Sequence, residues 1–254
     1  MIEMIKDIVS KKLFKNKFKK NTLNLDDESL ILSMLGIKSF NKVLFIGINK
    51  KSLIEDYIKK NQYEYLNIFD PSTSKLNVYS NVHLNSFFSQ VESDFVKYYA
   101  KSEYDSNATF FQKDLRWIKY NDDTEYELEI KDEESVYENY DLLFLALNGY
   151  ELRYMKNFSN LKNQIKIVKF AFSKFNIDSR NFLKDYFMFF YEQDFICFQL
   201  SKNGLVRIKK YNTSFENDFE KIYYFVNKKF LTNINFKSSF EYKLENYVDK
   251  EIIE

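Results

Sequence analysis

The chain has 254 residues, 45% of them hydrophobic, so it can bury the core of one large domain or of one domain with an extension. Its 38 Lys and Arg against 37 Asp and Glu give a net charge of +1, which excludes a global field that attracts nucleic acid or an anionic membrane. One cysteine, Cys197, excludes a disulfide framework within the chain and predicts a reducing compartment.

The first part of the chain, residues 1–40, is expected to form a helical lead-in. Apolar residues recur at helical spacing near the start, and a second helix is expected to begin at Asp26 and to end at Gly36. The basic stretch 11–20 is interpreted as a solvated helix face or an arm. A contact with phosphates or with a membrane surface is the alternative for this stretch.

From residue 41 the pattern changes to apolar runs that alternate with amphipathic segments, as in α/β domains. Strands are expected at 43–46, 63–69, 81–88, 142–147, 166–172 and 223–226, and a hairpin at 195–200 and 205–210. The segments 95–99 and 125–130 are expected to form short antiparallel strands or ordered loops. Helices are expected at 50–60, 132–140, 150–161 and 179–190. We therefore expect a doubly wound, mostly parallel sheet over residues 41–230, with an antiparallel C-terminal hairpin. Residues 231–254 are expected to form a helix or a tail.

Three details of these elements are also predicted. Pro71, the single proline, fixes φ and lacks an N–H directly after the second expected strand, so the chain must leave the sheet there. Helical spacing in the segment 50–60 predicts that four residues face inward, namely Leu53, Ile54, Tyr57 and Ile58. Cys197 lies inside an apolar run and is therefore expected to be buried rather than nucleophilic.

The turn after the first expected strand is the clearest ligand candidate. Gly47 lets the backbone approach a ligand without a Cβ clash, and the helix that follows offers free N–H groups. Asn49 could hydrogen-bond a carboxylate or an amide. Asp70 ends the second strand, about twenty residues further on, where an acidic residue takes both hydroxyls of a ribose in dinucleotide folds. A solvated, capping aspartate is the alternative interpretation of Asp70.

The phosphate-binding pattern of a dinucleotide fold is incomplete around this turn. The second and third glycines of the fingerprint are missing, and there is no Walker-type loop. A nucleoside-like cofactor without a pyrophosphate therefore fits better than NAD or ATP, and S-adenosylmethionine is the usual one. A second strand, Gly turn and helix follow at Asn148, Gly149 and Glu151, another place where open α/β domains put chemistry.

Five segments resemble, in the same order, the FkbM-type family of S-adenosylmethionine-dependent methyltransferases, over roughly residues 41–230. These segments are Phe45-Ile-Gly-Ile-Asn49, Phe69-Asp-Pro71, Asn81-Val-His-Leu-Asn-Ser-Phe-Phe-Ser89, Leu143-Phe-Leu-Ala-Leu-Asn-Gly-Tyr-Glu-Leu152 and residues 182–207. The resemblance implies a Rossmann-like methyltransferase sheet and O-methylation of a sugar or polysaccharide-precursor hydroxyl. It also implies that the cofactor is held by Gly47, Asn49, Asp70, Ser86 and Asn148.

The chain departs from the family pattern at several acidic positions. Phe45 stands at the position of the loop acid, Lys51 at that of the second loop glycine, and Ala146 and Asn148 at two acids of the later motif. A methyltransferase-like scaffold that binds a partner protein without catalysis is therefore the alternative function.

A methyltransferase would need a base to help deprotonate the acceptor hydroxyl. The candidates are Glu151, Asp114 and His83. Glu151 could instead stabilise the helix by a favourable interaction with its dipole. His83, the only histidine, could instead occupy an exposed position on a strand without a catalytic role. Without further histidines, His-rich metal sites are excluded. The aromatic segment 98–120 could stack against a sugar, with packing as the alternative.

The remaining expectations concern location and partners. No apolar run approaches the ~20 residues that span a bilayer, and residues 1–10 lack the apolar core of a signal peptide. We therefore expect a cytoplasmic protein that acts on a small molecule or a glycan, with no transmembrane segment and no nucleic-acid partner. A homo-oligomer or a partner protein stays open.

Overall fold

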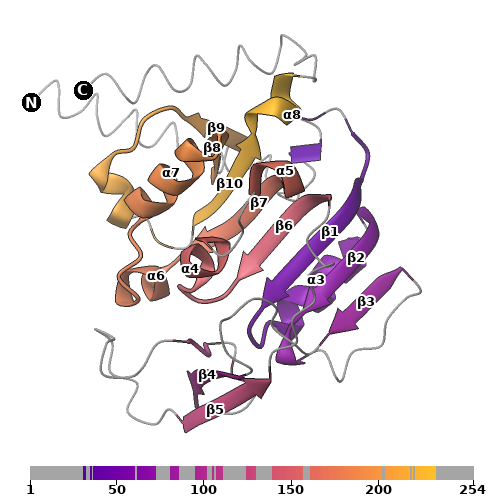
Figure 1. Cartoon of the computed structure of the whole chain (residues 1–254), viewed down its shortest axis with the longest axis vertical. Coiled ribbons are helices and arrows are strands. Elements are labelled where there is room, and N and C mark those ends of the chain that lie inside the picture. The colour runs from indigo at the N-terminus through magenta and orange to yellow at the C-terminus, as the bar shows by residue number, and fades with distance from the viewer. Residues whose placement is uncertain are drawn as a thin grey trace, which may run out of the picture.

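The computed structural model describes residues 31, 32, 35, 37–60, 62–72, 81–85, 95–101, 105, 107–110, 124–129, 139–156, 161–201, 204–217, 219 and 221–232. Within these residues the chain forms an eight-stranded sheet and a separate two-stranded sheet (Figure 1). The strand order of the large sheet is β3-β2-β1-β6-β7-β10-β8-β9. Residues 1–30, 132–138 and 233–254 lie outside the described residues, so the helices and the tail expected there remain predictions. The helix expected at 132–140 is wrong at its end, because Tyr140 begins the strand β6 (Tyr140–Ala146).

The large sheet is parallel in its first five strands and antiparallel in the rest. Its strands are β1 (Phe40–Gly47), β2 (Tyr63–Phe69), β3 (Val82–Asn85), β6 (Tyr140–Ala146), β7 (Ile165–Phe172), β8 (Phe195–Ser201), β9 (Gly204–Ile208) and β10 (Lys221–Asn227). The pairs β3–β2, β2–β1, β1–β6 and β6–β7 are parallel. β10 lies between β7 and β8 and is antiparallel to both, and β8 and β9 form the expected hairpin. The mixed α/β architecture is confirmed.

The central strands are buried because their residues are apolar on both faces. In β6 every residue from Tyr140 to Leu145 is buried, which is the pattern of a parallel strand covered on both sides. Cys197 is buried in β8 as expected, and burial raises the pKa of its thiol. The second sheet pairs β4 (Phe95–Ala100) with β5 (Thr124–Glu129) in antiparallel register, as the alternation in these segments predicts.

Helices cover both faces of the large sheet. They are α3 (Lys51–Lys60), α4 (Glu151–Lys156), α5 (Leu161–Gln164), α6 (Lys174–Asp178), α7 (Leu183–Glu192) and α8 (Lys228–Thr232), with a 3₁₀ helix η4 (Thr213–Asn217). One core cluster joins α3 and α8 to one face, and another joins α4, α5 and α7 to the opposite face. No helix among the described residues is both long enough and apolar enough to cross a bilayer.

The helix expected at 179–190 is wrong in its first turn. The chain breaks between α6 and α7, where Arg180 adopts a left-handed φ of 58°. Two side chains in this break bind the carbonyl oxygen of Gly149, because Ser179 Oγ donates to it at 2.9 Å and Asn181 Nδ2 at 2.7 Å. The break is therefore fixed by a contact with a distant turn.

The inward face predicted for the helix α3 is only partly right. Ile54 and Tyr57 are buried, and so is Ile58, whereas Leu53 is 40% exposed. Leu53 borders a cavity beside the helix instead of packing on the sheet. Pro71 directly follows β2 and begins a short 3₁₀ turn with Ser72, as expected for a chain that leaves the sheet.

Candidate site at the carboxyl edge of the sheet

The strand order reverses at β1, and this reversal places two turns side by side. β1 pairs with β2 on one side and with β6 on the other, and Gly47 is the register partner of Ala146. The connections that leave β1 and β6 therefore start next to each other at the carboxyl edge. In open α/β sheets, such a switch point is where ligands bind.

Gly47 and Asp70 come together at this edge, as the sequence predicts. A Cβ placed on Gly47 would lie 2.6 Å from Asp70 Oδ2 and 2.7 Å from Phe45 Cε1. Both distances are shorter than a carbon atom can tolerate, so only glycine permits this approach. The ring of Phe45 is fully buried here, packed at 4.8 Å between centroids against Phe144.

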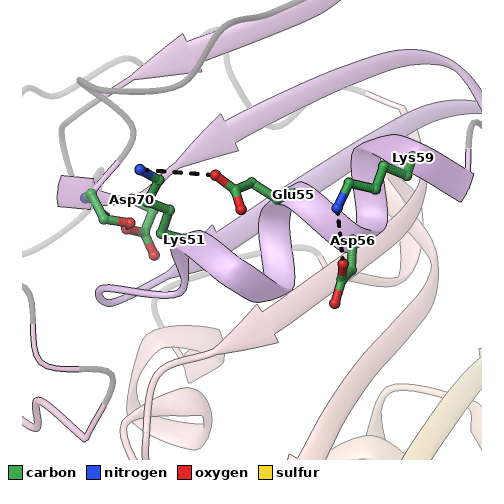
Figure 2. Close-up of polar contacts among 6 residues, drawn as sticks. Lys51, Glu55, Asp56, Lys59 and Asp70 are labelled. Carbon is green, nitrogen blue, oxygen red and sulfur yellow. Dashed lines mark hydrogen bonds and ion pairs between the residues drawn. The ribbon is translucent and has the colours of Figure 1, made fainter.

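The Asp70 carboxylate is fully buried, and groups of the fold itself bind both of its oxygens. Oδ2 accepts from the backbone N–H of Lys50 at 2.9 Å, while Oδ1 accepts from the N–H and hydroxyl of Ser72 at 2.8 and 2.5 Å. Figure 2 shows Asp70 beside the start of α3, whose exposed ion pairs follow further along the helix. In this structure Asp70 therefore holds the chain at the entry to α3.

Burial raises the pKa of Asp70 above its ordinary value of 3.8, although hydrogen bonds from Ser72 and Lys50 oppose this shift. A raised pKa means that the folded state binds the proton more tightly than the unfolded state. This contribution to stability is complete below the unfolded pKa and is lost as pH rises through the folded pKa.

We therefore expect Asp70→Asn to become more stable relative to wild type as pH rises above about 4. Urea unfolding of both proteins at a series of pH values measures the difference in free energy of unfolding. Glu64→Gln, an exposed change on the same strand, is the control and should show no such trend. A difference for Asp70→Asn that stays constant or falls with pH would contradict the assigned direction.

The second turn is organised by the buried carboxylate of Glu151, which is 2% exposed. Its Oε1 accepts from the N–H of Leu147 at 2.9 Å, and its Oε2 accepts from the N–H of Gly149 at 3.0 Å. Oε2 also accepts from Asn176 Nδ2 at 3.0 Å and from the hydroxyl of Tyr186 at 3.3 Å. Burial raises the pKa of Glu151 above its ordinary value. This catalytic candidate thus holds the turn after β6.

The partners of Glu151 could not be found from the sequence. Asn176 and Tyr186 lie 25 and 35 residues beyond it, and no local pattern marks them. Asn176 also accepts from the N–H of Ser173 at 2.8 Å, so the same side chain caps α6. This buried network connects the turn after β6 and the start of α4 with α6 and α7.

Asn148 connects three segments at the rim of the edge. Its Oδ1 accepts from Lys50 Nζ at 2.8 Å, and its Nδ2 donates to the carbonyl oxygen of Ala108 at 2.6 Å. Asn49 is buried in the neighbouring turn, and both asparagines have a left-handed φ, of 49° for Asn148 and 55° for Asn49. Asparagine tolerates this conformation better than most residues, which explains two turns built on Asn.

The other site candidates are placed less completely. His83 lies in β3, in register with Asn67 of β2, but its side chain is not among the described ones. Ser86 and Asp114 lie outside the described residues. The structure thus brings together Gly47 and Asp70, with Asn148 joined to them through Lys50.

A cavity of about 810 Å³ opens beside these turns. Its wall includes Lys50, Asn148 and Glu151 at the carboxyl edge, and then runs between α3 and the sheet. Gly47, Asn49 and Asp70 are not among the lining residues, and the side chains of Asn49 and Asp70 are buried. An adenosyl group would therefore reach Asp70 only if the segment around Lys50 and Ser72 moved.

Described residues between β3 and β6, among them Thr109 and Phe110, also contact the turn at the carboxyl edge. Figure 1 shows β4 and β5 apart from the large sheet, beyond the ends of β1 and β6. Tyr99 of β4 pairs with Thr109, whose hydroxyl donates to the carbonyl oxygen of Asn148 at 3.5 Å. The rings of Phe110 and Tyr150 lie 4.8 Å apart. These aromatic residues pack on the turn, and stacking against a sugar remains a prediction.

No family model, curated protein or solved structure matches this chain. Among the residues that the structure describes, no group of three or more His, Cys, Asp or Glu could hold a metal ion. The chemistry of the site therefore has to be inferred from the turns and the cavity.

Proposed function

We propose that this chain is a divergent S-adenosylmethionine-dependent O-methyltransferase that acts on the hydroxyl of a sugar or polysaccharide precursor. The observation that carries the proposal is the contact of Gly47 with Asp70 at the reversal of strand order. The parallel order β3-β2-β1-β6-β7, followed by an antiparallel hairpin, supports it because the family resemblance implies such a sheet. The cavity beside the two turns leaves room for an acceptor.

The residues of the edge would act mainly by positioning. A bound S-adenosylmethionine supplies a methyl group that is already activated, so the protein has to align donor and hydroxyl and to exclude water. Gly47 would allow close backbone approach, and Asp70 would accept the ribose hydroxyls in place of its Ser72 hydrogen bonds. Glu151 would keep the turn that carries Asn148 in place. Asp114 and His83 remain candidates for the base that deprotonates the acceptor hydroxyl, on the ground of the sequence alone.

A non-catalytic scaffold that binds a partner protein is the second candidate function. Two observations favour it. The ring of Phe45 fills the space under Gly47, at the position where the family has an acid, and the Asp70 carboxylate is already bound by groups of the fold. Ala146, at another acidic position, offers no polar group to a ligand.

Calorimetric titration with S-adenosylmethionine and S-adenosylhomocysteine separates these two functions. We expect saturable binding to the wild type, and a loss of affinity of about tenfold or more in Asp70→Asn, because a charged acceptor for two hydroxyls is removed. Glu64→Gln removes the same charge from an exposed position on β2 and should bind as the wild type does.

Three outcomes decide the matter. Binding that depends on Asp70 supports the proposed cofactor site. Binding that Asp70→Asn leaves unchanged rejects the ribose assignment. If millimolar ligand produces neither heat of binding nor a shift in melting temperature, the methyltransferase proposal is wrong and the scaffold is favoured. The reason is that specific binding must stabilise the fold by mass action.

A further inference from the structure

We infer that the cavity between α3 and the sheet is a binding site for a small molecule with an aromatic or apolar body and an anionic group. This is the cavity that the proposed function leaves to an acceptor, but the inference does not depend on the cofactor or the reaction, because it is argued from α3 and from the face of the sheet. At about 810 Å³ the cavity lies within the range of small-molecule sites, roughly 300–1,000 Å³.

One side of α3 forms the first wall of the cavity. Lys50 precedes the helix, and Leu53, Tyr57 and Lys60 follow at intervals of three or four residues, so they lie along one stripe. The stripe is about 15 Å long at a rise of 1.5 Å per residue. A ligand along this wall would meet an ammonium group at each end, and between them the side chains of Leu53 and Tyr57 with the carboxylate of Asp56.

The opposite wall is a hollow in the face of the sheet. Phe144 of β6 is the register partner of Lys169 of β7, and two residues further along each strand stand Ala146 and Ala171. Residues two apart on a strand share a face, so large side chains give way to small ones at this point. Ala171 is exposed and pairs with Ile222 of β10, which also lines the cavity.

Lys169 brings a positive charge to the floor of this hollow. It is 3% exposed, and its Nζ lies 4.2 Å from the ring centroid of Phe144 and 5.6 Å from that of Tyr224. Lysine is almost never fully buried in a protein interior, so its position on an apolar sheet face is informative. An anionic group in the cavity would meet this ammonium beside two aromatic rings.

The charges on the described wall favour an anion. Lys50, Lys60 and Lys169 line the cavity, with Asp56 and Glu151 as the acidic residues. Asp56 forms an ion pair with Lys59 at 3.5 Å (Figure 2), and the Glu151 carboxylate is bound by the donors of the turn after β6. Three lysines against two carboxylates thus give the described wall a net positive charge, while Tyr57, Phe144 and Phe175 offer ring surfaces.

A matched pair of fluorescent probes tests both parts of the inference. 8-Anilinonaphthalene-1-sulfonate carries the anionic group, and N-phenyl-1-naphthylamine has the same ring system without it. We expect saturable binding of one sulfonate probe per chain, and weaker binding of the neutral probe by about tenfold, because a charge-assisted hydrogen bond is absent.

Three variants locate the probe. Lys169→Met removes the charge and keeps most of the length of the side chain. This variant should bind the sulfonate probe about tenfold more weakly and the neutral probe as the wild type does. Ala171→Phe fills the hollow from an exposed position and should abolish binding of both probes. Lys184→Met removes the same charge from the exposed surface of α7 and should change neither. Circular dichroism and melting temperature confirm that each variant is folded.

Two results would overturn the inference. If folded Ala171→Phe binds the sulfonate probe as the wild type does, the probe binds elsewhere. If Lys169→Met affects both probes equally or neither, the cavity does not select anions. Failure to bind S-adenosylmethionine with these probe results intact would contradict the proposed function alone.

Discussion

Gly149→Ala is expected to destabilise the fold by about 3 kcal/mol or more, since a left-handed backbone and a backbone clash add together. Gly149 has a φ of 95°, and an added Cβ would lie 2.4 Å from the carbonyl oxygen of Phe175 and 2.8 Å from Ser179 Oγ. The nearest atom belongs to the backbone of α6, so this helix would have to move. Urea unfolding monitored by tryptophan fluorescence or circular dichroism measures the change.

Arg180→Gly is the matched control for this prediction. Arg180 also has a positive φ, of 58°, but its side chain is exposed. Glycine there relieves strain in the folded chain and adds freedom to the unfolded chain, so stability should change by no more than about 0.5 kcal/mol. Equal unfolding midpoints for Gly149→Ala and wild type would mean that the turn after β6 is not held against α6.

Glu151→Ala is expected to cost about 3–5 kcal/mol of stability, because it leaves several buried donors without their shared acceptor. These donors are the N–H groups of Leu147 and Gly149 and the amide of Asn176. The free energy of unfolding from urea titration measures the loss. Near-ultraviolet circular dichroism should also change, since Tyr186 donates to the same carboxylate.

Two further variants serve as comparisons for the stability of Glu151→Ala. Glu192→Ala removes a glutamate from the exposed end of α7 and should change stability by less than about 0.5 kcal/mol. Glu151→Gln keeps the shape but turns an NH₂ group toward a donor, so it should fall between wild type and Glu151→Ala. If Glu151→Ala is as stable as the wild type, the carboxylate does not organise the turn, and a catalytic role returns as its explanation.

The sequence predicted the strands well where the signal is local. The strand expected at 63–69 matches β2 at both ends, and the expected hairpin pairs Ser201 with Gly204. Runs of apolar residues and an Asn-Gly turn are sufficient for such elements. The position of β10 between β7 and β8 has no local signal, because it depends on pairing between distant segments.

The break between α6 and α7 shows where sequence reasoning fails. Residues 179–182 contain neither Gly nor Pro, and the helical pattern runs through them. The break exists because Ser179 and Asn181 bind the carbonyl oxygen of Gly149, a contact across about thirty residues that periodicity does not contain.

The candidate site was predicted in part. Gly47 and Asp70 meet as expected, but the sequence does not show that Asp70 is bound by Lys50 and Ser72. The sequence does contain a pattern that indicates the cavity. Lys169 and Ala171 interrupt an otherwise bulky strand on one face, and such a pair of residues favours a hollow with a charge in it.

The position of β10 has a consequence for how the chain assembles. β8 and β9 are made before β10, yet β8 has no other neighbour in the large sheet through which to join β7. During synthesis, the edge of β8 that will pair with β10 therefore stays unpaired until residues 221–227 leave the ribosome. These residues then pair with β7 on one side and with β8 on the other. Closing a sheet late by distant pairing is slow, and the unpaired strand edge is exposed to aggregation in the meantime.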